Sequence, residues 1–351
     1  MRIGFFSGVY FPRKDGACYT INSWKERLER EGHEVFVIYP DVEEYDPGEN
    51  EIPVSSIPDP WYYGHRWPTP LGTRKFPELD IVHCHSPGLL GIMGRYYAWK
   101  KNLPSLFTFH SPLEEYAEGL FPSKIASKIF KTIFVSADEF YLSTFDAVTT
   151  NTGDIRNRDI DPVELPAGID MEFFRPREES FLEEMDLERP IAGYSGRLSE
   201  EKNIEHIIEM AEGFDGALVI VGNGRNEKKL KQMGGEDVIF MDYLEREKLP
   251  EFYSGLDVFV HASEADTFSL SSLEANACGT SVVAPSVRPF TQVISEEAGE
   301  LYGFGRIEEF RVKVEKAASG QYDCRKAVER YSLEKTVERL QEMYSDLEDA
   351  S

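Results

Sequence analysis

Long hydrophobic runs, cysteines and positive charge are all scarce in this chain of 351 residues. No apolar segment approaches the ~18–20 residues that a membrane-spanning helix needs. The four cysteines are far apart and match no zinc-binding spacing, so we expect buried free thiols rather than disulfides or metal ligands. With 63 acidic and 38 basic residues the net charge is −25. This argues against nucleic acid as a partner, because phosphate binding needs a broad basic surface.

A signal peptide and a dinucleotide-binding fingerprint are also missing. The chain passes from Met1 straight into a predicted strand, so we expect a cytoplasmic protein. An NAD-dependent oxidoreductase should carry Gly-x-Gly-x-x-Gly directly after its first strand, but Ser7-Gly-Val-Tyr-Phe-Pro follows here. The sequence therefore disfavours that class of enzyme.

The length and the hydrophobic pattern predict two domains. Short apolar segments alternate with amphipathic ones in both halves, which is typical of parallel sheets covered by helices on both faces. We expect an α/β chain of two Rossmann-like domains that face each other across a cleft. The predicted parts are a first domain over 1–170, a charged linker over 171–189, a second domain over 190–332, and a C-terminal helix over 333–351 that packs back on the first domain.

The elements themselves follow from periodicity and from breakers such as Gly32. The predicted strands are 2–6, 34–38, 81–84, 105–109, 147–150, 191–195, 217–221, 238–240, 258–260 and 281–284. The predicted helices are 17–31, 89–99, 121–144, 204–211, 227–233, one that ends at Gly279, 306–318, 324–330 and 333–347. The segment 41–79 is rich in Pro, Gly and aromatics and predicts loops and short strands.

Two carboxylates accompany the helix that ends at Gly279. Asp266 lies just before this helix and Glu274 lies within it. A helix N-terminus offers free N–H groups that suit a phosphate, and a carboxylate further in can bind the hydroxyls of a ribose. The arrangement indicates a nucleotide-sugar site. The alternative is that Asp266 is an ordinary helix cap and Glu274 a solvated surface residue.

Seven segments stand in order along nearly the whole chain. They are Phe11-Pro-Arg-Lys-Asp-Gly16, Asp80-Ile-Val-His-Cys-His85, Thr108-Phe-His110-Ser-Pro-Leu-Glu-Glu-Tyr116, Pro166-Ala-Gly-Ile-Asp170, Gly196-Arg197-Leu-Ser-Glu-Glu-Lys202-Asn203, Val221-Gly-Asn-Gly224 and the block with Asp266 and Glu274. Together they resemble the retaining glycosyltransferases of the GT-B fold, specifically family four, which includes glycolipid and mannosyl-lipid synthases.

The resemblance implies a donor site for a nucleotide diphosphate sugar in the second domain. Glu274 would hold the ribose hydroxyls, Asp266 would contact the transferred sugar, and Arg197 and Lys202 would bind the diphosphate. Two fixed cations can stabilise the charge of the leaving diphosphate without a metal. The alternative makes Lys202 a surface partner of a neighbouring glutamate. The resemblance places further donor contacts at Gly16, Gly196, Gly222, Asn223, Phe268, Ser269 and Leu270.

Three positions depart from the family pattern. Asp266 replaces the usual glutamate and is one methylene shorter, which bears on the choice of sugar. Ser269 replaces the usual glycine and could crowd the diphosphate. Asp15-Gly16 replaces two glycines, which predicts a tighter or more anionic loop, and Gly16 could equally be a simple turn residue.

His110 ends a predicted strand and, by the resemblance, faces the sugar and the acceptor. We expect it to orient the sugar, because family members transfer with retention through front-face attack, in which the leaving phosphate takes the acceptor proton. No pair of glycosidase-type carboxylates is then required. His85 is a weaker candidate on the acceptor side. Either histidine could instead be structural.

Lys124, Lys128 and Lys131 share one face of the predicted helix 121–144, and the segment 119–135 contains no acidic residue. Such a helix can lie on an anionic membrane surface and deliver a lipid acceptor. The alternative is an ordinary surface helix that packs its apolar face on the core.

These patterns together predict a metal-independent, retaining hexosyltransferase that uses a nucleotide sugar such as UDP-glucose or GDP-mannose and needs no cofactor. The expected acceptor is a membrane lipid, which implies a peripheral position on the inner face of the cell membrane. A soluble or polysaccharide acceptor is the nearest alternative, and a non-catalytic nucleotide-sugar-binding protein is another.

Overall fold

The structure is a computed structural model in which the chain divides into two compact units. The first unit comprises Met1–Gly168 together with Leu333–Ser351, and the second is Ile169–Ser332. The segment 171–189 belongs to the second unit and the C-terminal helix to the first. The described residues are 1–13, 15–58, 66–69, 76–110, 124–155, 158–236, 238–264 and 266–350, without the side chains of 124–127, 129 and 130.

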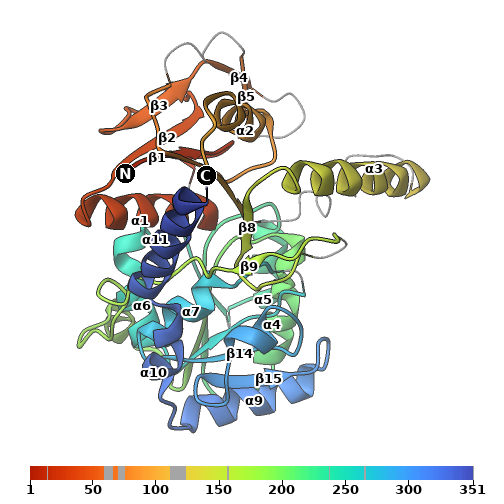
Figure 1. The fold of residues 1–351 in the computed structure, drawn as a ribbon. Coiled ribbons are helices and arrows are strands. Elements are labelled where there is room, and N and C mark those ends of the chain that lie inside the picture. Colours follow the sequence, from red (N-terminus) through yellow and green to blue (C-terminus); the bar gives the residue numbers. More distant parts are fainter. Residues whose placement is uncertain are drawn as a thin grey trace. The chain divides into compact units, whose positions relative to one another are not determined.

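The first unit is built on a seven-stranded sheet whose neighbouring strands are all parallel (Figure 1). The strands lie in the order β3 (Glu51–Val54), β2 (Glu34–Pro40), β1 (Arg2–Phe6), β6 (Ile81–Cys84), β7 (Ser105–Phe109), β8 (Ala147–Thr150) and β9 (Val163–Glu164). Strands β4 (Ser56–Pro58) and β5 (Arg66–Pro68) form a short antiparallel pair. The helices are α1 (Gly16–Arg30), α2 (Leu89–Lys101), α3 (Lys124–Leu142) and α11 (Leu333–Asp349).

The core of the first unit joins residues from the two ends of the chain. Helix α11 buries Leu333, Val337, Leu340 and Tyr344, a spacing of three or four residues that places them on one helical face. This face packs with α1, whose Trp24 is fully buried and donates its indole N–H to the carbonyl of Ala167 at 2.7 Å.

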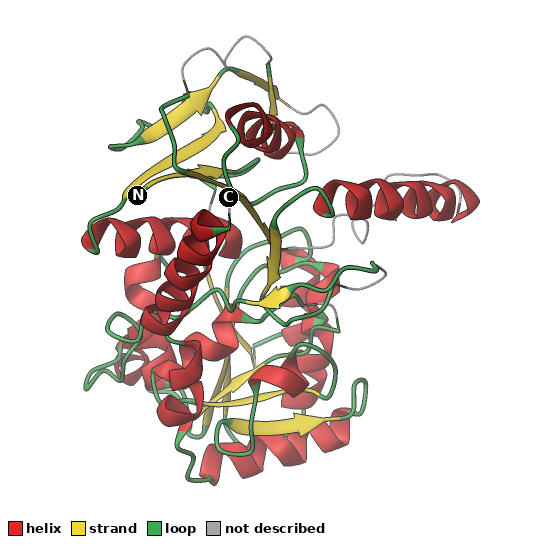
Figure 2. Ribbon diagram, in the orientation of Figure 1, coloured by secondary structure: helices red, strands yellow, loops and turns green. Residues whose placement is uncertain are grey.

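The second unit holds a six-stranded parallel sheet with helices between successive strands (Figure 2). The strands lie in the order β12 (Val238–Met241), β11 (Ala217–Val221), β10 (Ile191–Ser195), β13 (Val258–Val260), β14 (Ser281–Pro285) and β15 (Gly299–Tyr302). The helices are α4 (Ile204–Ala211), α5 (Glu227–Gly234), α6 (Leu249–Gly255), α7 (Leu270–Ala277), α8 (Phe290–Val293), α9 (Ile307–Ser319) and α10 (Cys324–Val328). Short 3₁₀ turns span η3 (Phe181–Met185), η4 (Glu200–Lys202), η5 (Arg246–Lys248) and η6 (Glu329–Tyr331).

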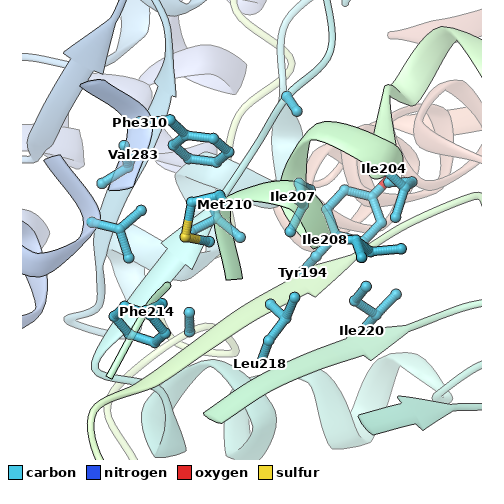
Figure 3. Close-up of a cluster of buried hydrophobic side chains, with 14 of the residues drawn as sticks. Tyr194, Ile204, Ile207, Ile208, Met210, Phe214, Leu218, Ile220, Val283 and Phe310 are labelled. Atoms are coloured by element: carbon cyan, nitrogen blue, oxygen red, sulfur yellow. The ribbon is translucent and has the colours of Figure 1, made fainter. Parts of the chain in front are cut away.

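One hydrophobic cluster fills the space between this sheet and helices α4 and α9 (Figure 3). Ile204, Ile207 and Ile208 of α4 meet strand residues such as Ile220, and Phe310 of α9 stacks on Tyr302 with ring centroids 4.1 Å apart. This packing fixes the sheet whose strand ends carry the candidate site.

The prediction of an α/β chain with two Rossmann-like domains is confirmed. The predicted helix 17–31 is α1 and begins one residue earlier, at Gly16. Periodicity did not reveal α6, whose Pro250 lies in the first turn, nor the short strand β15. Within the described residues, no helix is both long and apolar enough to cross a membrane.

Candidate functional site

The predicted donor residues other than Gly16, which belongs to the first unit, lie toward one edge of the second sheet. Strands β10 and β13 are parallel neighbours at the point where the order of the sheet reverses. In open α/β sheets, ligands bind outside the carboxyl ends of the strands at such a reversal. The loops that leave these two strands are 196–203 and 261–269. They contain most of the predicted donor-binding side chains.

Lys202 and Asp266 form an ion pair that joins the two loops. The Nζ of Lys202 lies 3.0 Å from Oδ2 of Asp266, and both side chains are largely buried. The hydroxyl of Ser263 adds a second link, because it donates to the carbonyl of Glu201 at 2.9 Å. The alternative interpretation of the sequence paired Lys202 with the neighbouring Glu200 or Glu201. In the structure its partner is instead Asp266, on the facing loop.

The carboxylate of Asp266 is bonded through both oxygens. Its Oδ1 accepts the N–H groups of Thr267 at 2.8 Å and Ser269 at 3.2 Å. Burial raises the pKa of Asp266, but the charge of Lys202, the protonated form that His261 takes at low pH, and the Thr267 N–H together outweigh it and lower the pKa to about 2. Asp266 is thus ionised and holds the loop before α7. It is not the cap of that helix, whose N-cap residue is Ser269.

His261 belongs to this network and was not predicted. Its Nε2 lies 3.4 Å from Oδ2 of Asp266, and its Nδ1 accepts the N–H of Ser263 at 3.2 Å. Since Nδ1 is an acceptor, we assign the proton of the neutral ring to Nε2, facing Asp266. Burial lowers the pKa of His261 to about 4 against the opposing effect of Asp266, so the ring is neutral at neutral pH. The sequence signal that could have revealed His261 is its position directly after the apolar strand β13.

Ser269 turns the backbone into α7 with φ 61° and ψ 61°. This left-handed region favours glycine, which gives a physical reason for the glycine expected here. The serine is buried, and its Oγ lies 2.7 Å from Oγ of Ser272, within the helix. The first turn of α7 leaves the N–H groups of Leu270 and Ser271 without an intrahelical acceptor, as at every helix N-terminus. Phe268 is buried beside them.

Glu274 is half-buried on α7 rather than fully solvated. Its Oε2 accepts the hydroxyl of Tyr253 at 3.0 Å. Burial raises the pKa of Glu274, although Arg246 and Tyr253 oppose this. Arg246 in turn lies over the ring of Phe173, 4.5 Å from its centroid. Sequence reasoning missed Tyr253 and Arg246, because nothing in their local patterns marks them as neighbours of Glu274.

Arg197 is the exposed member of the predicted set. Its side chain is 61% exposed, and its guanidinium lies 3.9 Å from the carboxylate of Glu201. The backbone is held more firmly, since the hydroxyl of Tyr194 donates to the carbonyl of Arg197 at 3.2 Å. An exposed guanidinium on a fixed backbone can reach an anion without breaking a buried contact.

Gly222 and Asn223 support the loop after β10 through their backbones. The Leu198 N–H donates to the carbonyl of Asn223 at 2.8 Å. Gly222 has φ 137°, and a Cβ there would collide with the carbonyl of Gly196. Both residues therefore contact the loop that carries Arg197 and Lys202, and the Gly222 N–H also donates to the carbonyl of Met241 at 3.1 Å.

Three histidines stack in the first unit at the ends of β6 and β7. The ring centroids of His83 and His85 are 4.1 Å apart, and Nδ1 of His85 lies 3.1 Å from Nε2 of His110. Burial lowers the pKa of all three, to about 4 for His110. His83 bridges Tyr344 at 2.7 Å and Thr108 at 2.6 Å, which is a structural role. His85 contacts His110 directly.

The N-terminus of α1 already carries an anion. Gly16 is the first residue of the helix, and the carboxylate of Asp15 caps it by accepting the Cys18 N–H at 3.0 Å. Arg13 pairs with the same carboxylate. Asp15, in place of a second glycine, therefore occupies the helix end itself.

The lysines of α3 are only partly described. Lys128 is exposed and Lys131 half-buried, whereas the side chain of Lys124 and the residues 111–123 lie outside the described part of the chain. Ile133 and Phe140 are exposed, so these apolar residues of α3 do not pack on the core. Among the described residues, no group of three or more His, Cys, Asp and Glu side chains could hold a metal ion.

Two family models match the chain in succession. Residues 15–172 match Glycosyltransferase Family 4, and residues 177–335 match Glycosyl transferases group 1.

Curated relatives and solved structures agree with these matches. A GDP-mannose-dependent alpha-mannosyltransferase of Mycolicibacterium smegmatis is 29% identical over 81% of this chain and 80% of its own length. An alpha-monoglucosyldiacylglycerol synthase of Streptococcus pneumoniae is 27% identical over 86% of this chain and 75% of its own length. Among solved structures, a sucrose-phosphate synthase from Thermosynechococcus elongatus aligns with a TM-score of 0.73 at 19% identity over all of both chains. Anabaena Alr3699/HepE in complex with UDP and glucose gives 0.73 at 16% identity over 99% of this chain and 100% of its own.

Proposed function

Because the chain belongs to the glycosyltransferases, with a Family 4 first half and a group 1 second half, we propose that it transfers a hexose from a nucleotide diphosphate sugar to a membrane lipid, with retention and without a metal. The expected donors are of the UDP-glucose or GDP-mannose type. Relatives named for GDP-mannose and for a glucosyldiacylglycerol support the donor class and the lipid acceptor.

The observation that carries the proposal is the position of Lys202. Its ammonium group is held 3.0 Å from Asp266, at the strand-order reversal and on the loop next to the start of α7. A diphosphate at the N-terminus of α7 would meet the free N–H groups of Leu270 and Ser271 and the positive end of the helix. Lys202 and the exposed Arg197 would then supply two positive charges.

These charges account for catalysis without a metal. As the bond between sugar and phosphate breaks, negative charge grows on the leaving diphosphate, and cations fixed in advance stabilise that charge in the transition state. Glu274 is assigned to the ribose hydroxyls, which can donate hydrogen bonds to its carboxylate. Burial raises the pKa of Glu274, and hydrogen bonds from a ribose would stabilise the ionised carboxylate.

Retention requires the acceptor to attack the face from which the diphosphate departs. In this step the acceptor oxygen forms the new bond to the anomeric carbon, the bond to phosphate breaks, and the acceptor proton passes to a phosphate oxygen. His110 is neutral at neutral pH and has Nε2 engaged with His85. These properties support a role in orienting the sugar rather than in removing a proton.

The test is a transfer reaction in excess EDTA. UDP-glucose and GDP-mannose are each offered vesicles that contain diacylglycerol or phosphatidylinositol, and in parallel soluble sugars, and the anomeric configuration of the product is read by NMR. We expect a lipid α-hexoside from an α-linked donor. A β-linked product would contradict retention, a requirement for divalent metal would contradict the role given to Arg197 and Lys202, and transfer to soluble sugars alone would contradict the lipid acceptor.

A further inference from the structure

Helix α2 (Leu89–Lys101) turns mostly small residues toward the sheet at its closest approach. Its buried residues are Leu90, Gly91, Gly94 and Ala98, three of them small. A Cβ at Gly94 would lie 2.6 Å from the ring of Phe6, so the helix sits too close to the sheet for larger side chains on that face. Helices on the surface of a soluble domain normally bury their large apolar residues.

Four other large residues of α2 face outward, while Leu90 is buried and Met93 and Tyr97 pack against the core. Leu89 is 48% exposed, Ile92 50%, Tyr96 57% and Trp99 69%. At 100° per residue these four lie within about 80° of arc, so they form one continuous stripe. We call these four residues the α2 stripe. The rings of Tyr96 and Trp99 are in contact, with centroids 5.8 Å apart.

The charged residues of helix α2 are all basic. Helix α2 contains Arg95, Lys100 and Lys101 and no acidic residue, in a chain with 63 acidic and 38 basic residues. Lys100 and Lys101 are exposed. The antiparallel strands β4 and β5, of which β5 contacts α2, add the cross-strand pair Ile57 and Trp67, which are also exposed.

We propose that the α2 stripe is a docking surface for an anionic lipid bilayer. Exposed Leu and Ile can enter the region of the acyl chains, Tyr and Trp are the residues preferred at the headgroup level, and the basic residues meet anionic headgroups. A stripe formed to bind a protein partner or a second copy would not require this one-sided charge. The proposal rests on the lipid acceptor of the proposed function, and it assigns the membrane contact to α2 rather than to α3.

The test compares matched double variants by co-sedimentation with vesicles of phosphatidylcholine, with and without equimolar phosphatidylglycerol. Ile92→Ser with Trp99→Ser removes two exposed residues of the stripe. Met233→Ser with Val312→Ser removes two exposed apolar residues of helices α5 and α9 in the second unit and is the control. We expect wild type and control to bind the anionic vesicles equally, and the stripe variant to bind at least about tenfold more weakly. Equal binding by both variants would overturn the proposal.

Fluorescence quenching and a measurement of oligomeric state distinguish membrane docking from dimerisation through the stripe. Acyl chains brominated near the headgroup should quench the fluorescence of Trp99, and the quenching should fall in Trp99→Phe while binding persists. A concentration-dependent dimer that the stripe variant abolishes, without vesicle binding by wild type, would show that a second copy covers the stripe and would also overturn the proposal. Nucleotide binding, measured without vesicles, tests the donor site alone, so a failure of docking is distinguishable from a failure of the proposed function.

Discussion

Lys202 and Asp266 stand 64 residues apart in the sequence, yet the Nζ of one lies 3.0 Å from the Oδ2 of the other. The pair links the loop after β10 to the loop before α7. The free protein thereby holds a lysine charge in place before any donor arrives. Fixing the charge in advance is what electrostatic stabilisation of a leaving group requires.

Replacement of Lys202 by alanine should impair both stability and catalysis. Asp266 would lose its cationic partner while largely buried, which we expect to lower the free energy of unfolding of the second unit by about 1–3 kcal/mol. Loss of the charge at the diphosphate should lower kcat about 100-fold or more. Lys229→Ala, which removes an exposed lysine that pairs with Glu205, is the control and should change neither. Urea unfolding and the transfer assay measure the two effects, and an unchanged kcat would contradict the role of Lys202.

Replacement of Glu274 by glutamine should separate stability from binding. The pKa of Glu274 is raised in the folded protein, whereas glutamate in the unfolded chain has a pKa of about 4.3. Ionisation of Glu274 therefore lowers the stability of the folded protein as the pH rises above about 4.3. Near neutral pH the glutamine variant should therefore unfold at an equal or slightly higher temperature than wild type. It should bind the nucleotide much more weakly, because the ribose loses an anionic acceptor. A variant that melts lower and still binds would contradict this assignment.

The stability of the second unit should depend on pH through His261. Its pKa is lowered to about 4 in the folded protein, against about 6.5 when unfolded. The neutral form of His261 thus contributes fully to the stability of the second unit above pH ~6.5, and this stability is lost as the pH falls towards 4. His261→Gln should show a shallower fall in Tm across this window than wild type. Parallel Tm curves for the two proteins would show that His261 is not held neutral by the fold.

The backbone at Ser269 should prefer glycine. Both Ser269→Gly and Ser269→Ala remove the hydroxyl that contacts Ser272, but only alanine keeps a Cβ at φ 61°. The glycine variant should therefore be more stable than the alanine variant by about 1 kcal/mol. Thermal unfolding of the two variants, compared directly, gives the difference. Equal stability would mean that the turn relaxes when its side chain changes.

The sequence predicted much of the fold, because most strands are short and mainly apolar, and helices end at breakers such as Gly32 and Gly279. The C-terminal strand β15 was missed, since Gly-Glu-Leu-Tyr at 299–302 shows no apolar run. The candidate site was predicted in part. Lys202 and Asp266 were both predicted as site residues. Their pairing was not, because it depends on the order of the strands in the sheet, which no local sequence pattern indicates.

Other members of the site could not be found from local sequence. Tyr253 and Arg246 reach Glu274 from α6 and η5, more than 20 residues earlier in the chain. The exposure of the large residues of the α2 stripe could not be read from the sequence, because apolar residues occupy the buried face of α2 as well. Only the close approach of Gly91 and Gly94 to the rest of the first unit shows that the core lies on the other face.

The most direct test of the account is calorimetric titration of UDP, GDP and ADP into the purified protein in the presence of EDTA. We predict that UDP or GDP binds, that Glu274→Ala abolishes the binding, and that Lys202→Ala and Arg197→Ala each weaken it. Binding that needs divalent metal, or that survives in Glu274→Ala and Lys202→Ala, would contradict the donor site described for the loops after β10 and β13.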